Sequence, residues 1–289
     1  MHRHWELLDY AKMRQLHSWR IEDFEYTGDT VQTQWGRYIY RDNGSNLLAV
    51  AHLDTVQGKP GFALYKTNDN DRIVESPQLD DRLGVYVILD LLPKLGINCD
   101  VLLTEGEEMG MSTAQWFTTE KKYHWLFQFD RAGDDCVNYS YSDQEFDSRL
   151  RDVGWRVDRG LFSDICFLEH LGAKGFNVGV GYYDYHSAKA WASMRDMLTG
   201  VSRFEEFYRR WKDTPMPHKE AVTEWRGWGN WGREYTCTEC GEPITGKGLW
   251  CDSCSQLYDL GVCVWCDDVA PVDNFGLCAK CQDRERETT

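Results

Sequence analysis

Apolar runs of strand length alternate with amphipathic segments up to about residue 211. Residues 47–52 and 99–105 are nearly continuous apolar runs, a pattern typical of buried strands. Between them, residues 81–95 carry apolar side chains three or four positions apart, which predicts a helix that begins at Asp80 or Asp81 and ends before Gly96. Strands that alternate with helices predict an α/β fold, a three-layer sandwich with a mostly parallel central sheet.

Shorter patterns supply the remaining elements of this predicted fold. Residues 36–42 and the run from Leu47 are joined by Asn43-Gly44, which predicts a hairpin. We also expect a helix at 5–19, a strand pair at 62–66 and 72–74, helices at 111–119, at 146–155 and after Ser163, strands at 125–130, 137–141 and 175–181, and a long amphipathic helix at 187–211.

The chain divides by composition into three parts. Residues 1–212 hold the alternating pattern and are expected to form one large domain, since 289 residues suffice for such a domain and an appendage. Residues 213–233 form a linker. Its glycines favour flexibility and its tryptophans favour docking onto a domain, and both interpretations stay open. Residues 234–289 contain eight of the eleven cysteines.

Polar residues follow several apolar runs at the point where each run ends. His52 and Asp54 lie two positions apart, so their side chains point to the same side of an extended chain. A zinc-bound histidine needs a partner on its other ring nitrogen, and this pair can supply the ligand, His52, and the partner, Asp54. In parallel sheets, sites collect at the carboxyl ends of strands. The other residues that follow apolar segments in this way are Asp80, Asp81, Glu107, Glu108, Asp130 and His186.

Each of these residues has an ordinary explanation when it is taken alone. The aspartates can cap a helix or lie in a turn, the glutamates can form a solvated turn, and the histidine can begin a helix. Taken together, they match what two zinc ions need: a bridging carboxylate, one histidine and one further carboxylate each, and a free carboxylate that accepts a proton from water. The set therefore favours a metal site.

The order of motifs resembles that of the co-catalytic dinuclear zinc exopeptidases, the superfamily of zinc aminopeptidases, carboxypeptidase-like enzymes and related deacylases. The resemblance lies in HLDT, LDDRLG, EGEEMG, FDRAGDD and GYYDYHS, and it covers roughly residues 36–211. It implies these roles: His52 as a ligand of the first zinc, Asp54 as its partner, Asp80 as the bridging carboxylate with a cis peptide bond to Asp81, Glu107 as the general base, Glu108 and Asp130 as ligands of one zinc each, and His186 as the histidine of the second zinc.

The spacing of the motifs resembles the compact aminopeptidase branch. Deacylase and carboxypeptidase relatives often carry a lid or dimerisation domain before the last histidine. Only 55 residues separate Asp130 from His186, and 27 separate His52 from Asp80, which leaves no room for such a domain. Two zinc ions would lower the pKa of a shared water, and Glu107 would accept its proton. Tyr182 or Tyr183 is a candidate donor to the oxyanion that then forms.

Four Cys-x-x-Cys pairs lie within residues 237–281. Eight thiolates in such pairs predict two tetrahedral zinc sites rather than disulfides, and these sites would stabilise a short segment. Sequential pairing gives two zinc ribbons, while an interleaved arrangement and rubredoxin-like iron are the alternatives. The sequential ligands are Cys237, Cys240, Cys251 and Cys254, followed by Cys263, Cys266, Cys278 and Cys281.

Charge and hydropathy narrow the range of partners. The 32 Lys and Arg residues against 47 Asp and Glu give a net charge of −15, which makes nucleic acid an unfavourable partner. No apolar stretch approaches the roughly 20 residues that cross a bilayer, so we expect a cytoplasmic protein without membrane association. From Gly232 on, five Lys or Arg stand against eleven Asp or Glu. This acidic tail is expected to be structural, to bind a protein partner or to capture substrate.

The leading hypothesis is an aminopeptidase that removes N-terminal residues from peptides, with two catalytic and two structural zinc ions. One alternative is a deacylase or other amidohydrolase of small N-acyl compounds. The other is a non-catalytic adaptor whose zinc ribbons bind a partner. Zinc content separates the adaptor from the enzymes, because the tail alone would bind about two zinc ions and the enzyme about four.

Overall fold

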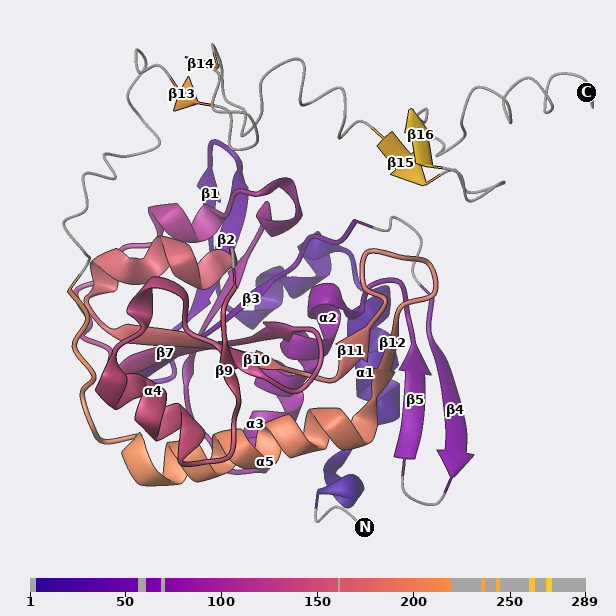
Figure 1. Cartoon of the computed structure of the whole chain (residues 1–289), viewed down its shortest axis with the longest axis horizontal. Helices are drawn as coiled ribbons and strands as arrows, with labels where there is room; N and C mark the ends of the chain where they lie inside the picture. Colours follow the sequence, from indigo (N-terminus) through magenta and orange to yellow (C-terminus); the bar gives the residue numbers. More distant parts are fainter. Residues whose placement is uncertain are drawn as a thin grey trace, which may run out of the picture. The chain divides into compact units, whose positions relative to one another are not determined.

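The computed structural model describes residues 4–56, 61–68, 71–160 and 162–219, together with four short strands between residues 235 and 271. The chain forms two compact units, Met1–Ala221 and Val222–Thr289. The first unit carries the α/β fold and every described candidate site residue (Figure 1).

An eight-stranded sheet with the order β1-β2-β6-β3-β7-β10-β8-β9 forms the centre of the first unit (Figure 1). Its four middle strands are parallel, and all residues of three of them, β3, β6 and β10, are buried, which explains the nearly continuous apolar runs of β3 and β6. The predicted α/β fold with a mostly parallel central sheet is therefore confirmed. The strands are β1 (Asp29–Thr33), β2 (Gly36–Arg41), β3 (Leu47–His52), β6 (Asp100–Thr104), β7 (Trp125–Arg131), β8 (Cys136–Val137), β9 (Val157–Asp158) and β10 (Lys174–Gly179).

Helical segments connect the strands. The helix expected at 81–95 is confirmed, because α2 continues through a π-helical turn, η3, into α3. The segment expected to be helical at 111–119 contains only the short 3-10 helix η5. The helical segments are η1 (Trp5–Leu7), α1 (Tyr10–Ser18), η2 (Ile21–Thr27), α2 (Leu79–Tyr86), η3 (Val87–Leu91), α3 (Leu92–Lys94), η4 (Glu107–Met109), η5 (Thr113–Trp116), η6 (Tyr139–Tyr141), α4 (Gln144–Arg151), η7 (Asp164–Leu171) and α5 (Met194–Trp211).

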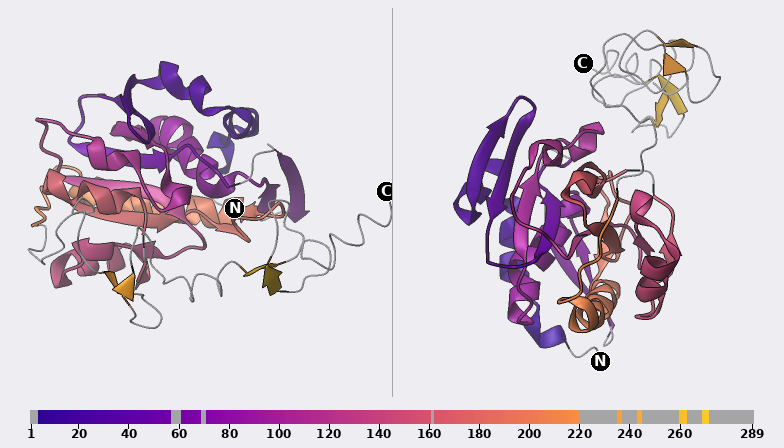
Figure 2. Two further views of the ribbon diagram at one scale, coloured as in Figure 1. Left: turned by 90° about the horizontal axis from the view of Figure 1, so that it is seen from above. Right: turned by 90° about the vertical axis from the view of Figure 1, so that its left-hand side faces the viewer.

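The two faces of the central sheet meet different helices. On β7, Phe127 points to one face and its ring lies 4.5 Å from that of Phe204 in α5. The next residue, Gln128, points to the opposite face, where it contacts Asp164 of η7. Helical segments therefore cover both faces, and Figure 2 shows the strands running between the α1 and α2 region and α4.

A second, four-stranded antiparallel sheet has the order β11-β12-β5-β4. The strand pair predicted at 62–66 and 72–74 is confirmed as β4 and β5. The helix expected at 187–211 begins only at Met194, because the residues before it form β12 and pair with β5. The strands are β4 (Ala63–Asn68), β5 (Asp71–Glu75), β11 (Tyr182–Tyr183) and β12 (Trp191–Ser193).

The predicted hairpin through Asn43-Gly44 is wrong. β6 lies between β2 and β3, and β2 pairs with β1 and β6 instead. The physical reason is the buried carboxylate of Asp100 at the start of β6. It accepts hydrogen bonds from the backbone of Asn43 at 2.9 Å and of Ser45 at 3.1 Å, and so holds the connection across the end of that strand.

In the second unit, two short hairpins pair β13 (Tyr235–Thr236) with β14 (Pro243–Ile244) and β15 (Leu260–Val262) with β16 (Val269–Pro271). The eight cysteines predicted to bind zinc and most of the predicted linker lie outside the described residues. Among the residues described, no helix is both long and apolar enough to cross a membrane.

Candidate active site

Three neighbouring strands bring candidate ligands to one edge of the central sheet. His52 is the last residue of β3, and Asp130 lies at the end of β7 beside it. Glu107 and Glu108 form the start of η4, which follows β6 on the other side of β3. Because the three strands are parallel, their carboxyl ends meet, as the sequence pattern predicts.

Asp80 connects the two candidate histidines. Its Oδ1 lies 3.0 Å from Nε2 of His52, and its Oδ2 lies 3.1 Å from Nε2 of His186. His186 reaches this position from the loop between β11 and β12, with a left-handed backbone conformation (φ 59°). The peptide bond between Asp80 and Asp81 is cis, as the resemblance implies.

Each histidine also has a second carboxylate of its own. Oε2 of Glu108 lies 3.0 Å from Nε2 of His186. Oδ1 of Asp130 lies 3.5 Å from Nε2 of His52. Oε2 of Glu107 is farther away, at 3.9 Å from Nε2 of His52. The cluster thus consists of two histidine–carboxylate pairs that share one carboxylate, with a further glutamate beside them.

Asp54 supports His52 in a way that differs from the expected one. Nδ1 of His52 lies 2.9 Å from the backbone carbonyl oxygen of Asp54, while the carboxylate of Asp54 is 3.7 Å away. That carboxylate instead accepts hydrogen bonds from the backbone N–H groups of Gly106 and Glu108, at 2.9 and 3.1 Å. Asp54 therefore holds the segment that carries the two glutamates in place.

The donor set fits a cation. Because a carbonyl oxygen can only accept, Nδ1 of His52 carries a proton, and Nε2 is the ring atom that faces the carboxylate oxygens and could bind a cation. Among the described residues, Oδ2 of Asp81 and Oε1 of Glu108 are buried without a hydrogen-bond donor. A cation would satisfy all of these atoms at once.

Two overlapping groups bring potential ligand atoms within 4.8 Å of one another, namely His52, Asp81 and Asp130, and His52, Asp80 and Glu108. Asp81 was expected only as the partner in the cis peptide bond. It is completely buried and lies within 4.8 Å of His52 and Asp130, and nothing in the local sequence pattern distinguishes it from a helix-capping aspartate.

The shifted pKa values of the cluster also favour a bound cation. Burial and the negative charge of Asp130 raise the pKa of Glu107 to about 9. Burial and the charge of Asp80 raise the pKa of Asp130 to about 7. Hydrogen bonds to Asp80 and Glu108 raise the pKa of His186 to about 10. Carboxylates packed so closely oppose one another's ionisation, and nearby positive charge relieves that repulsion.

The two tyrosines considered as oxyanion donors both have other partners. The Tyr182 hydroxyl donates to Oδ1 of Asp130 at 3.2 Å, and burial raises its pKa, so that it keeps its proton. The Tyr183 hydroxyl donates to Asp196 at 2.9 Å. Tyr182 therefore contacts the cluster, whereas Tyr183 is held in a separate interaction.

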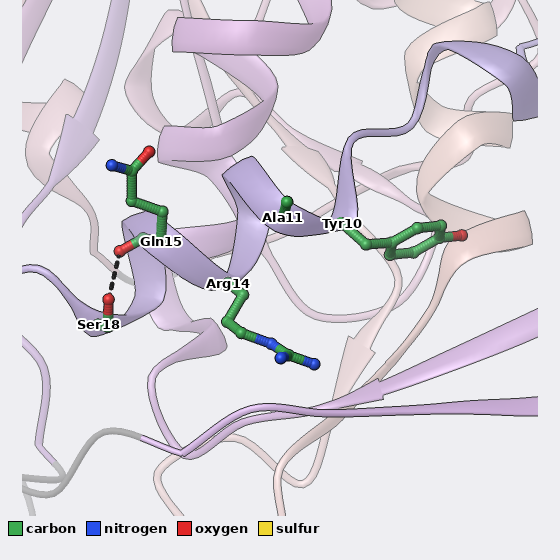
Figure 3. Close-up of a pocket in the computed structure, with 5 residues that line it drawn as sticks. All are labelled: Tyr10, Ala11, Arg14, Gln15 and Ser18. Atoms are coloured by element: carbon green, nitrogen blue, oxygen red, sulfur yellow. Dashed lines mark hydrogen bonds between the residues drawn. The ribbon is translucent and has the colours of Figure 1, made fainter.

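A surface pocket elsewhere on the first unit has different chemistry. Figure 3 shows its lining residues on α1, where the Ser18 hydroxyl donates to the carbonyl oxygen of Gln15 at 2.7 Å. None of the candidate ligands lines this pocket, which is formed by Tyr10, Ala11, Arg14, Gln15 and Ser18.

Solved structures of other proteins have a fold similar to that of this chain. The chain is similar to the TET aminopeptidase from the marine sediment archaeon Thaumarchaeota archaeon SCGC AB-539-E09, with a TM-score of 0.50 and 12% sequence identity over 70% of this chain and 96% of that one. The two chains share a fold. No family model matches the sequence, and neither does any curated protein.

Two further similar structures are also peptidases by description. Aminopeptidase APDkam598 from the archaeon Desulfurococcus kamchatkensis is 14% identical, with a TM-score of 0.47 over 74% of this chain and 98% of that one. A tripeptidase from Staphylococcus aureus is 10% identical, also with a TM-score of 0.47, over 68% of this chain and 90% of that one.

Proposed function

We propose that this protein is an aminopeptidase that removes N-terminal residues from peptides with the help of two zinc ions. The observation that carries the proposal is the carboxylate of Asp80, which lies between His52 and His186 with one oxygen near each ring. A bridging carboxylate is what two neighbouring cations need. The fold shared with the archaeal aminopeptidase supports the same reaction class.

The ligands divide into two sets around the shared aspartate. His52, Asp80 and Asp130 would hold one zinc ion, and His186, Asp80 and Glu108 would hold the other. Zinc bound there supplies a Lewis acid that lowers the pKa of water and polarises a carbonyl group.

Glu107 is the proposed general base. Its carboxylate borders the cluster at 3.9 Å from Nε2 of His52 and belongs to neither proposed ligand set, so it is free to take a proton from the attacking water and to return it to the leaving amine. Positive charge beside it would lower its raised pKa, so that the carboxylate is ionised near neutral pH. Asp54 keeps this glutamate in position through the backbone of η4.

Glu107→Gln tests the proposal, because it removes the proton acceptor and keeps the size of the side chain. We expect turnover of aminoacyl p-nitroanilides to fall by about 10²- to 10⁴-fold, while zinc content measured by elemental analysis stays unchanged. Glu105→Gln is the matched control, because its carboxylate pairs with Arg37 at 2.9 Å outside the cluster. Unchanged turnover in the Glu107 variant would refute the assignment.

The same substrates distinguish the deacylase alternative. An aminopeptidase needs a free α-amine, so N-acetylated aminoacyl p-nitroanilides should not be cleaved. Cleavage of simple N-acyl amino acids without cleavage of free aminoacyl substrates would favour a deacylase instead.

A further inference from the structure

A second buried carboxylate lies behind the candidate ligand Asp130. It belongs to Asp164, the first residue of η7, whose surface is completely buried. Gln128 on β7 lies between the two carboxylates. Its Nε2 is 3.1 Å from Oδ2 of Asp130 and 2.9 Å from Oδ2 of Asp164, and it is itself completely buried.

The amide of Gln128 has only one suitable orientation. Nε2 carries two protons, and both are used, one for each carboxylate. On the other side, Oε1 accepts a hydrogen bond from the Ser163 hydroxyl at 2.6 Å. If the amide were turned over, its oxygen would lie between two carboxylates, and both hydrogen bonds from Nε2 would be lost.

Asp164 has no freedom to move away from this amide. Its Oδ1 is occupied by the hydroxyl of Thr104 at 2.8 Å and by the hydroxyl of Ser112. Only Oδ2 remains for Gln128. Since Thr104 is the last residue of β6, Asp164 connects the ends of two strands that border the cluster.

The two oxygens of Asp130 are consequently unequal. Oδ2 accepts a hydrogen bond from Gln128 at 3.1 Å, while the single proton of the Ser163 hydroxyl is directed to Oε1 of Gln128 at 2.6 Å. Oδ1 is the oxygen nearer to His52, at 3.5 Å from its Nε2. The hydrogen bond from Gln128 therefore fixes Oδ2, while Oδ1, which also accepts from the Tyr182 hydroxyl at 3.2 Å, faces the histidine and the cation that it would hold.

We propose that Gln128, oriented by Asp164, is a positioning residue for the metal centre. It occupies one oxygen of Asp130 and presents the other to the cation that His52 would hold. This inference rests on the proposed function, since it assumes that the cluster binds metal. Buried partners of this kind typically change metal affinity about 10- to 100-fold when they are removed.

Gln128→Met provides the first test, because methionine has a similar length and no amide. We expect zinc affinity of the full-length protein, measured by competition with a chromophoric chelator, to fall about 10- to 100-fold at one site of the cluster. The other site should keep its affinity. With cobalt(II) in place of zinc, the visible absorption spectrum should shift, because Asp130 can then turn both oxygens to the metal.

A double variant that exchanges the carboxylate and the amide distinguishes a positioning role of Gln128 from a purely structural one. Gln128→Glu combined with Asp164→Asn keeps a carboxylate–amide pair between positions 128 and 164, but it places a carboxylate against Asp130. Compared with Gln128→Glu alone, the double variant should regain melting temperature in the metal-free state, while its zinc affinity stays low. Gln115→Met is the control, because its exposed amide bonds only to the backbone of Ser112.

The outcomes distinguish this inference from the proposed function. If the natural protein binds zinc in the cluster and Gln128→Met binds it equally well with an unchanged cobalt spectrum, the inference is wrong and the proposed function stands. Recovery of zinc affinity in the double variant would also overturn it. If the natural protein binds no zinc in the cluster, both fail.

Discussion

At the scale of single residues, His17 in α1 couples stability to pH. The side chain is 1% exposed. Nδ1 donates to the carbonyl oxygen of Met13 at 2.8 Å, and Nε2 has no partner among the described residues. Burial, together with the positive charge of Arg82, lowers its pKa to about 4, so the folded protein holds this histidine neutral.

This pKa predicts a loss of stability in mild acid. An unfolded histidine takes up a proton near its ordinary pKa of 6.5, while the folded one stays neutral until about pH 4. The stabilisation is therefore complete above pH 6.5 and is lost as the pH falls towards 4, by roughly 3 kcal/mol in all. In urea titrations between pH 7 and pH 4.5, His17→Phe should lose less stability than the natural protein.

A surface histidine provides the comparison. His170 is exposed, so His170→Phe should follow the pH dependence of the natural protein. If the free energy of unfolding falls equally with pH in the natural protein and in His17→Phe, burial of this ring does not set the acid sensitivity.

At the scale of elements, α2 must approach β7 closely, because α2 carries Asp80 and β7 carries Asp130. Gly84 makes the approach feasible. A Cβ at this position would lie 2.2 Å from Oδ1 of Asp81 and 2.2 Å from the carbonyl oxygen of Phe129. The second atom belongs to the strand backbone, which cannot yield without moving its neighbour Asp130, a proposed ligand.

Gly84→Ala is therefore expected to destabilise the protein. Alanine in place of glycine usually stabilises a helix by up to about 1 kcal/mol. Overlap of its Cβ with backbone atoms costs about 1–3 kcal/mol. Because the Cβ would lie only 2.2 Å from its neighbours, the cost of overlap exceeds the gain. Chemical denaturation should show the loss, and zinc affinity should fall with it. Gly61→Ala is the control, since its nearest neighbour is a ring carbon of Pro77 at 3.3 Å. Higher stability of Gly84→Ala would contradict this account.

At the scale of the whole molecule, we propose that the two units bind metal independently. The domain proposed at 1–212 would be catalytic, and the segment proposed at 234–289 would hold two four-cysteine zinc sites. The full chain should contain about four zinc ions and a chain ending at Ala221 about two, by elemental analysis. About two ions in the full chain and none in the shorter one would favour the adaptor.

Metal removal gives a second test at this scale. An ion that binds only the folded state stabilises it, so a strong chelator should lower the melting temperature of the chain ending at Ala221. In the cluster the effect should be large, because removal of cations leaves several carboxylates crowded around His52 and His186. A melting temperature that does not respond to chelator or added zinc would speak against a metal centre there.

Local sequence patterns predicted most of the strands and helices and the residue types of the candidate site. Continuous apolar runs predicted the buried strands, and His52 and Asp130 at the ends of such runs lie at one edge of the sheet. Patterns of this kind are readable because a strand buried on both faces is apolar at almost every position, whereas burial along a helix repeats every three or four residues. The same patterns do not specify which strands pair, and the hairpin expected at Asn43 was wrong for that reason.

The sequence by itself determined the α/β class, the strand ends and the acidic and histidine side chains available there. The resemblance in its motifs also implied the bridging place of Asp80. Only the tertiary structure decided that the carbonyl of Asp54 rather than its carboxylate supports the ring, and that Gln128 joins two carboxylates. The reason is physical. Periodicity records the environment of each residue along the chain, whereas contacts between distant residues depend on how whole elements pack together.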